Sequence, residues 1–321
     1  MTRLAAVDCG TNSLRLLISE VRDGHVRDIY RGMEIVRLGQ GVDATGEFDP
    51  EALERTRIVL ERYVDIMKIE RVEAVRMVAT SATRDAGNRN EFFTMTSKLL
   101  NQVAPNRGAE VISGEEEAQL SFSGAVSDLK ELPGPYCVID LGGGSTEFVV
   151  GTSDGEILGS HSSQMGCVRL TERIMRSDPP TSTEIDIAAD YVRERLSEVR
   201  AIVPISDAVT FVGCAGTFTT LSALAQGLEA YEATAIHGST LRFDALRVLC
   251  GDLLAQTSTQ RAAHPVIHEG RADVISGGAM VVDGITTMIE EETEVHEIMI
   301  SEKDILDGII NELARQRGEL E

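Results

Sequence analysis

The chain has 321 residues, of which 42% are hydrophobic, and this is enough apolar material for two hydrophobic cores rather than one. Its 52 acidic and 30 basic residues give a formal net charge of -22, which repels nucleic acid and excludes non-specific binding to DNA or RNA. No apolar run approaches the roughly twenty residues of a membrane helix, and the cysteines form no CxxC pair, so we expect a cytoplasmic protein with reduced thiols and no membrane partner.

Strands and helices alternate along the chain, which is typical of an α/β fold. In the first part, apolar alternation predicts strands at 3–9, 14–21, 25–30, 33–38, 73–79 and 109–112, with helices after Asp49-Pro50, at 88–103 and from Ser113. In the second part, strands are expected at 136–140, 145–151, 156–162 and 208–212, with helices near 167–176, 183–200, 215–226, 243–255, 270–290 and 303–316. The Pro133-Gly134-Pro135 segment predicts a boundary between domains 1–131 and 132–321.

A short segment recurs in both predicted domains. Residues 7–18 align with residues 139–150 when the chain is laid on itself at an offset of 132 residues, so that Asp8 faces Asp140. Glycine and serine coincide as well, and both segments are predicted as strand, polar turn, strand. We therefore expect two related domains that flank a cleft, each beginning with a phosphate-binding hairpin.

A glycine-rich turn follows the strand that ends at Asp140. Consecutive glycines let the backbone approach an anion and direct successive N–H groups at it, and neighbouring hydroxyls add donors. The candidate phosphate ligands are Gly142, Gly143, Gly144, Ser145 and Thr146. Asp140 at the base of the turn suits Mg²⁺. The alternative is an ordinary glycine hairpin, which would require neither the aspartate nor the Ser-Thr pair.

Other segments offer further anion contacts. The turn after Asp8 holds Thr11, Asn12 and Ser13, and Arg15 projects on the same side of its strand as Ser13. Residues 80–86 follow a strand and enter a helix, where Arg84 and the helix N-terminus favour an anion, although a simple helix cap explains the same residues. Gly216 and Thr217 also join a strand to a helix, and close packing is the equal alternative there.

Three glutamates begin the helix that Ser113 starts. Ser113 and Glu116 fit a capping box, which gives Glu116 a structural explanation. Glu117 shares its side of the helix with small residues such as Ser121, which leaves room for a ligand, and a carboxylate there is able to orient a water as general base. The pattern leaves both Glu115 and Glu117 open as the functional residue.

These motifs together resemble the exopolyphosphatase and guanosine pentaphosphate phosphatase family, a branch of the actin, Hsp70 and sugar-kinase superfold. The resemblance covers nearly the whole chain and rests on residues 7–16, 80–84, 111–118, 139–147, 165–169 and 216–217. It implies two RNase H-like domains and an enzyme that removes terminal phosphate from inorganic polyphosphate by metal-assisted attack of water.

The resemblance also implies a role for each candidate residue. It makes Glu117 the catalytic residue in place of its neighbours, and it assigns Asp8, Asp140 and Glu147 to the metal. The implied cofactor is Mg²⁺, with Mn²⁺ as an alternative and a monovalent cation as a further option. The implied phosphate ligands are Thr11, Asn12, Ser13, Arg15, Arg84, Gly142, Gly143, Gly144, Ser145, Thr146, Gly216 and Thr217.

Alternatives stay open within and outside this chemistry. The same site would convert guanosine pentaphosphate to tetraphosphate, but with 4% aromatic residues and no Trp the chain has few side chains for stacking on a base. A non-catalytic sensor of guanosine alarmones would lack Glu117, and a kinase would need a separate acceptor domain. Longer family members continue beyond this chain, so we expect a preference for short polyphosphate, or for a nucleotide, over very long polyphosphate chains. We also expect the helix at 303–316 to pack at the interface between the two domains of the chain. A further expectation is that the protein forms a homodimer.

Overall fold

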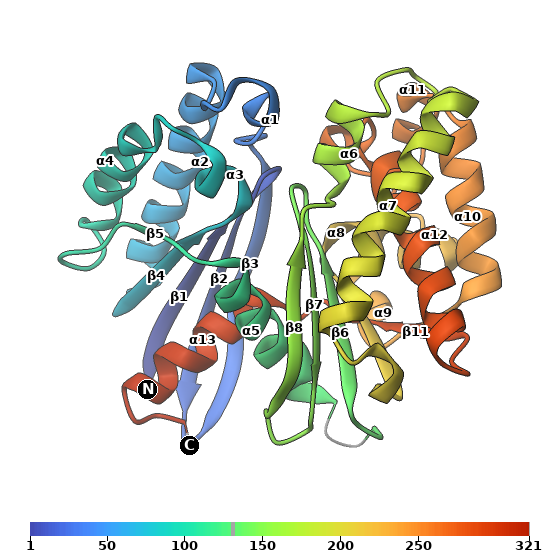
Figure 1. Cartoon of the computed structure of the whole chain (residues 1–321). Helices are drawn as coiled ribbons and strands as arrows, with labels where there is room; N and C mark the ends of the chain where they lie inside the picture. The colour runs from blue at the N-terminus through green and yellow to red at the C-terminus, as the bar shows by residue number, and fades with distance from the viewer. Residues whose placement is uncertain (130–131, 321) are drawn as a thin grey trace. The chain divides into compact units, whose positions relative to one another are not determined.

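The computed structural model describes residues 1–129 and 132–320 and divides the chain into two compact units. Unit 1 comprises Met1–Gly124 together with the residues from Ile305 onward, and unit 2 is Ala125–Asp304. The predicted boundary between residues 131 and 132 falls at residues 130–131, which lie outside the described residues. Each unit combines one mixed sheet with helices (Figure 1), as expected for an α/β fold. In the described part of the chain, no helix combines the length and the apolar character needed to cross a membrane.

Unit 1 contains a five-stranded sheet in the order β3-β2-β1-β4-β5. Its strands are β1 (Thr2–Cys9), β2 (Ser13–Arg22), β3 (His25–Ile35), β4 (Ala74–Ala79) and β5 (Ala109–Val111). Its helices are α1 (Val42–Thr45), α2 (Pro50–Ile69), α3 (Ser81–Asp85), α4 (Arg89–Leu100), α5 (Gly114–Ala125) and α13 (Ile305–Gln316). The first three strands form an antiparallel meander, whereas β4 and β5 run parallel to β1.

Strand β3 corrects one prediction, because it replaces the two strands expected at 25–30 and 33–38. It pairs with β2 from His25 to Ile35, with one irregularity at Ile18/Ser19. The chain then leaves the sheet, since the backbone N–H groups of Val36 and Arg37 both donate to the carbonyl oxygen of Asn12.

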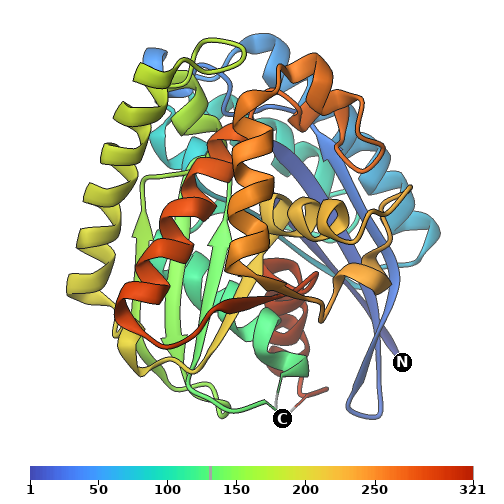
Figure 2. The same ribbon diagram turned by 90° about the vertical axis from the view of Figure 1, so that its right-hand side faces the viewer.

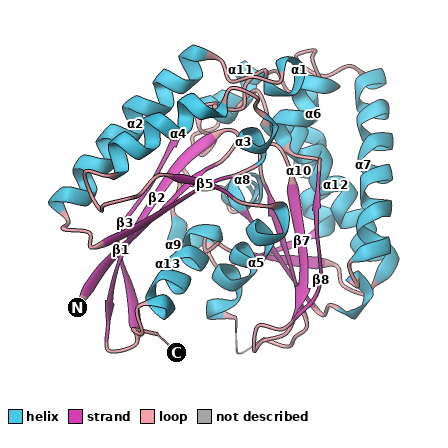
Figure 3. Ribbon diagram, turned by 60° about the vertical axis from the view of Figure 1, so that its left-hand side comes forward, coloured by secondary structure: helices cyan, strands magenta, loops and turns pink. Residues whose placement is uncertain are grey.

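Alternation along β1 divides the apolar residues of unit 1 between two cores. Ala5 and Val7 pack with residues of α2 and α4, whereas Leu4 and Ala6 pack with residues of α5 and α13. These two pairs of helices lie on opposite sides of the sheet (Figure 3). Asp8 continues the second row, so its side chain emerges on the face that carries α5 and α13.

The last helix belongs to unit 1, which corrects the prediction that placed it within residues 132–321. Leu306, Ile309 and Ile310 are buried against β1 and β2, and each such side chain contributes roughly 1.5–3 kcal/mol through the hydrophobic effect. Gly308 allows the close approach of α13 to α5, because a β-carbon there would clash with the carbonyl oxygen of Leu120. The apolar face of the helix therefore fixes its position on the first sheet, although it follows unit 2 in the sequence.

Unit 2 contains a six-stranded sheet in the order β10-β11-β9-β6-β7-β8. Its strands are β6 (Tyr136–Leu141), β7 (Thr146–Gly151), β8 (Ile157–Ser163), β9 (Thr210–Cys214), β10 (Thr240–Arg242) and β11 (Glu297–Ile300). Its α-helices are α6 (Cys167–Arg173), α7 (Ser182–Ile202), α8 (Ala215–Ala225), α9 (Ala233–Ile236), α10 (Phe243–Ala255), α11 (Ser258–Ala262) and α12 (Ile275–Glu292). The 3-10 turns are η1 (Val126–Asp128), η2 (Ile205–Asp207) and η3 (Glu269–Arg271). Helix α12 lies between α7 and α10 (Figure 2).

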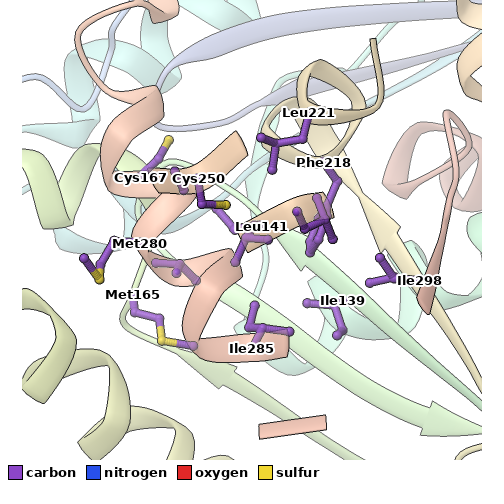
Figure 4. Close-up of a cluster of buried hydrophobic side chains, with 14 of the residues drawn as sticks. Ile139, Leu141, Met165, Cys167, Phe218, Leu221, Cys250, Met280, Ile285 and Ile298 are labelled. Atoms are coloured by element: carbon purple, nitrogen blue, oxygen red, sulfur yellow. The ribbon is translucent and has the colours of Figure 1, made fainter. Parts of the chain in front are cut away.

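One face of β6 packs against the hydrophobic core of unit 2. Ile139 and Leu141 pack there with Phe218 of α8 and with Met280 and Ile285 of α12 (Figure 4). Because side chains alternate across a strand, Asp140 between the two apolar residues points to the opposite face of the sheet.

The internal repeat predicted from the sequence is confirmed in three dimensions. Asp8 lies opposite Arg15 in the β1–β2 pair, and Asp140 lies opposite Glu147 in the β6–β7 pair, so the two hairpins share one register. In each turn the N–H group of the glycine donates to the serine carbonyl oxygen at 3.0 Å. Each hairpin is then joined by a parallel strand, β4 in unit 1 and β9 in unit 2, which supports an origin of the units from one ancestral fold.

Candidate active site

In unit 1, three predicted site segments meet at one edge of the sheet. They follow β1, β4 and β5, which are parallel and therefore end at the same edge. The N–H group of Thr80 donates to the carbonyl oxygen of Cys9 at 3.2 Å, and the N–H group of Ile112 donates to that of Ala79 at 3.2 Å. The first hairpin turn, the Arg84 segment and the start of α5 are consequently neighbours.

Asp8 and Arg15 form a partly buried ion pair across the first hairpin. The Nε and Nη2 atoms of Arg15 both donate to Oδ2 of Asp8, at 2.9 and 2.7 Å. Asp8 is 5% exposed, so this arginine largely offsets the charge of a buried carboxylate. The structure therefore places a cation beside the predicted metal ligand Asp8, which makes Asp8 the weakest of the three metal candidates.

The turn between Asp8 and Arg15 is fixed by backbone hydrogen bonds from the segment that follows β3. The carbonyl oxygen of Asn12 accepts hydrogen bonds from residues 36 and 37, and that of Thr11 accepts one from Gly39 at 2.8 Å. Thr11 is buried, whereas Asn12 and Ser13 are partly exposed. The segment after β3 thus fixes the turn by donating to its backbone carbonyl groups, and the side chains of Asn12 and Ser13 stay partly exposed.

The structure separates the glutamates of α5 by their surroundings. Glu115 is exposed, whereas Glu117 is only 9% exposed. The hydroxyl of Ser113 accepts a hydrogen bond from the N–H group of Glu116, as expected of a cap, but the Glu116 carboxylate pairs with Arg76 at 2.5 Å. Glu117 is therefore the buried carboxylate among the three, as suits a functional residue.

Arg84 holds Glu117 in place. Its Nη1 atom donates to Oε2 of Glu117 at 2.8 Å and to the carbonyl oxygen of Ile112 at 3.0 Å. Its Nη2 atom is buried and has no hydrogen-bond partner among the described residues. A buried guanidinium nitrogen without a partner is costly, so the site suits an anion that would accept from it.

In unit 2, the carbonyl groups of the glycine-rich turn face α6. The N–H groups of Cys167 and Val168 donate to the carbonyl oxygens of Gly142 and Gly143 at 3.1 and 2.9 Å, and Nε of the buried Arg169 donates to that of Gly144 at 2.7 Å. In a trans peptide the N–H group points opposite to the carbonyl group. The N–H groups of the turn are therefore directed away from α6, as in an anion-binding nest.

Two other contacts fix the shape of this turn. Gly166 lies so close to it that a β-carbon would clash with the backbone of Gly143. Thr146 is fully buried and its hydroxyl donates to the carbonyl oxygen of Met165, so this predicted phosphate donor is already engaged as an anchor. Ser145 is 2% exposed and is the remaining hydroxyl of the turn.

Asp140 and Glu147 bring two carboxylates together on one face of the sheet. They are cross-strand partners, they are 7% and 1% exposed, and the hydroxyl of Ser162 donates to Oε1 of Glu147 at 2.7 Å. Mg²⁺ is commonly bound through one or two carboxylates, with water and substrate phosphates as its other ligands. The pair fits such an ion, although no group of three metal-ligating side chains is found within residues 1–129 and 132–320.

The loop between β9 and α8 reveals a cation that the sequence did not single out. Arg271 in η3 lies directly against Gly216, where any β-carbon would overlap its guanidinium group. Burial raises the pKa of the nearby Cys167 thiol to about 11, and the charge of Arg271 acts in the opposite direction. Arg271 thus lies close to the start of both α6 and α8.

Thr217, the second predicted ligand in this loop, is differently placed. It is 4% exposed, and a β-carbon on Gly278 of α12 would lie 2.6 Å from its hydroxyl oxygen. Thr217 therefore packs against α12, which agrees with close packing, the alternative to ligand contact that the sequence left open for this loop. The sequence placed Arg271 in the first turn of the helix predicted at 270–290, whereas α12 begins at Ile275 and Arg271 lies in η3. That position gave no signal that distinguished Arg271 from other arginines.

Comparison with known proteins agrees with this geometry. Residues 17–316 match the profile of the Ppx/GppA phosphatase family. Over 318 residues the chain is 52% identical to exopolyphosphatase 2 of Mycobacterium tuberculosis, a match that covers 98% of this chain and 99% of the relative.

Solved structures share the same fold along their whole length. A crystal structure of an exopolyphosphatase-like protein superposes with a TM-score of 0.92 at 38% identity, covering 98% of this chain and all of the other. The exopolyphosphatase from Cytophaga hutchinsonii has a TM-score of 0.85 at 25% identity, covering 100% and 99% of the two chains. These likenesses confirm the predicted fold class.

Proposed function

Because the chain belongs to the Ppx/GppA phosphatase family, we propose that it is an exopolyphosphatase, which releases terminal phosphate from inorganic polyphosphate. The observation that carries the proposal is the pair formed by Glu117 and Arg84. A buried carboxylate is oriented by a guanidinium group whose second nitrogen has no partner among the described residues, next to a polar hairpin turn. Hydrolysis of a phosphoanhydride needs this combination of an oriented base and a cation for the anionic group under attack.

In the proposed reaction, Glu117 orients a water molecule and accepts its proton as the water attacks the terminal phosphorus. The bond between that phosphorus and the bridging oxygen breaks, so that orthophosphate and the shortened polyphosphate chain are released. Arg84 holds the carboxylate and donates from Nη2 to a phosphate oxygen. Positioning of this kind accounts for most of the catalysis of phosphoryl transfer, since the transition state spreads charge over the phosphoryl oxygens.

The remaining ligands belong to the two hairpins and to η3. The N–H groups of Gly143, Gly144 and Ser145 would donate to phosphate, together with the Ser145 hydroxyl. Arg15 and the Asn12-Ser13 turn would do so from the first hairpin. Arg271, beside Gly216, would add a cation to the contacts of unit 2.

Asp140 and Glu147 are the residues that would hold Mg²⁺, or Mn²⁺ in its place. The ion would supply positive charge to the phosphoryl oxygens of the substrate. Ser162 would keep the Glu147 carboxylate oriented in either case, because its hydroxyl donates to Oε1.

The test compares phosphate release from three substrates, namely tripolyphosphate, long-chain polyphosphate and guanosine pentaphosphate, in the presence of Mg²⁺. We expect orthophosphate from both polyphosphates, with the chains shortened one residue at a time from their ends. Random internal cleavage would contradict an exopolyphosphatase. Release from guanosine pentaphosphate alone would assign the site to the nucleotide, and binding without any turnover would identify a sensor.

A further inference from the structure

Arg261 on α11 is the bulkiest of the fully buried side chains in the described part of the chain, at 1% exposure. Burial of a guanidinium group is costly, and apolar residues of similar size often replace buried ion pairs without loss of stability. Burial lowers the pKa of Arg261 from its ordinary value, although Asp178 and Asp273 act in the opposite direction. Filling space therefore does not explain why an arginine occupies this position.

The contacts of Arg261 are all directed at backbone segments or at one carboxylate. Its Nη1 atom donates to the carbonyl oxygen of Ala272 at 2.5 Å and to that of Asp273 at 3.4 Å. Its Nε and Nη2 atoms donate to the carbonyl oxygen of Gln256 at 3.2 and 2.9 Å. Its Nη2 atom also pairs with Asp178 at 3.2 Å. One side chain thus joins three segments that are distant in the sequence.

Asp178 is itself fixed at the start of α11. Its Oδ1 atom accepts from the N–H group of Ser258 at 2.7 Å, and its Oδ2 atom accepts from the hydroxyl of Ser258 at 2.6 Å. The carboxylate is 46% exposed, whereas the Arg261 side chain is 2% exposed. Asp178 consequently anchors the guanidinium group from the surface side.

The segment that Arg261 holds contains Arg271. Ala272, whose carbonyl group accepts the 2.5 Å bond, is the next residue in the chain. The turn η3 that carries Arg271 has three residues, and such a short turn is poorly stabilised by its own hydrogen bonds. The position of the Arg271 guanidinium against Gly216 therefore depends on contacts made from outside the turn.

We propose that Arg261 and Asp178 form a positioning pair that fixes Arg271 for the binding of polyphosphate. The inference rests on the proposed function only in taking Arg271 as a phosphate ligand. Arg261 touches no substrate and acts through Arg271, so its loss weakens substrate binding and leaves the chemical step unchanged.

The test is a double-mutant cycle on the full chain, with KM and kcat measured for tripolyphosphate well below the unfolding temperature. Arg271→Ala should raise KM about tenfold or more, as for one lost bond to a charged group, with kcat within twofold. Arg261→Met should raise KM by a smaller factor and should add nothing in the Arg271→Ala background. Arg261→Lys should restore part of the binding. Arg247→Met, which breaks the ion pair of Arg247 with Glu290 in the same unit, should leave KM unchanged.

Other outcomes overturn the inference or the proposed function separately. Equal KM increases from Arg261→Met in both backgrounds, or a fall in kcat instead, would show a merely structural role. Should Arg261→Met fail to fold, Asp178→Asn provides the second arm of the same cycle, because it keeps the shape of the side chain and removes its charge. If the native chain releases no phosphate, the same double-mutant cycle is evaluated from the dissociation constant of tripolyphosphate, measured by calorimetry for the same variants. The absence of phosphate release would contradict the proposed hydrolase activity and would not bear on the positioning role of Arg261.

Discussion

Replacement of Glu117 by glutamine separates the chemistry of the site from its packing. The amide keeps an oxygen that accepts from Nη1 of Arg84, where the native bond measures 2.8 Å, but it cannot accept a proton from water. General-base catalysis contributes a factor of about 10²–10⁴ to the rate, so kcat for phosphate release should fall by that factor. This fall corresponds to a rise of about 2.7–5.4 kcal/mol in the activation free energy. The free energy of unfolding in urea should fall by less than in the Glu117→Ala variant, because the amide oxygen still accepts from Arg84 although the ion pair is lost.

The Glu117→Ala variant should lose stability as well as activity. Arg84 would keep only the carbonyl oxygen of Ile112 as a partner for Nη1, while Nη2 has none among the described residues. Removing one member of a buried ion pair costs about 3–5 kcal/mol, but the two side chains are 20% and 12% exposed, and solvent screening reduces the expected loss to about 1–3 kcal/mol. The matched control is Glu115→Gln, an exposed position where neither quantity should change. Near-native turnover by Glu117→Gln would refute the assignment of the base.

Three further variants test other parts of the fold. Gly166→Ala should lower kcat/KM for polyphosphate at least tenfold in phosphate-release assays, because the added methyl group displaces the glycine-rich turn. Mg²⁺ at one hundred times its Kd should raise the free energy of unfolding by about 2.7 kcal/mol in the native chain and by less in Glu147→Gln, a difference that urea titration measures. The pKa of Glu184 is lowered from its ordinary value of 4.5 to about 2, chiefly by the N–H group of Thr181. The ionised carboxylate therefore stabilises the fold fully at pH values above 4.5, and this stabilisation is lost as the pH falls toward 2. The stability gap between native chain and Glu184→Gln should close over that range, and a gap that does not depend on pH would contradict the assignment.

The hairpins were predictable because their signals are local. Aspartate, glycine and serine at fixed spacing specify a strand end and a turn, and the same backbone bond closes both turns in the structure. By contrast, β10 and β11 have three and four residues, too few for an alternating pattern to stand out. The placement of α13 depends on its packing against β1 and β2, and sequence order gives no information about such long-range contacts.

The site shows the same division between local and long-range information. Helical periodicity placed Glu117 on the side of α5 that carries Ser121, but it left the choice between Glu117 and Glu115 open until burial was known. Arg84 was identified as a candidate, but its bond to Glu117 joins residues 33 positions apart. Arg271 reaches Gly216 only through tertiary structure, because η3 and α8 are brought together by the folding of unit 2.

The two hairpins share a register, but the residue opposite the aspartate differs between them, and this difference favours separate roles for the two hairpins. In unit 1 the aspartate faces Arg15, so the pair carries no net charge. In unit 2 the aspartate faces Glu147, and two carboxylates directly opposite each other destabilise a sheet. A bound cation would relieve this repulsion, whereas Arg15 already offsets the charge of Asp8. We therefore propose that a divalent ion would be held by Asp140 and Glu147 rather than by Asp8, and that the first hairpin would donate hydrogen bonds to phosphate.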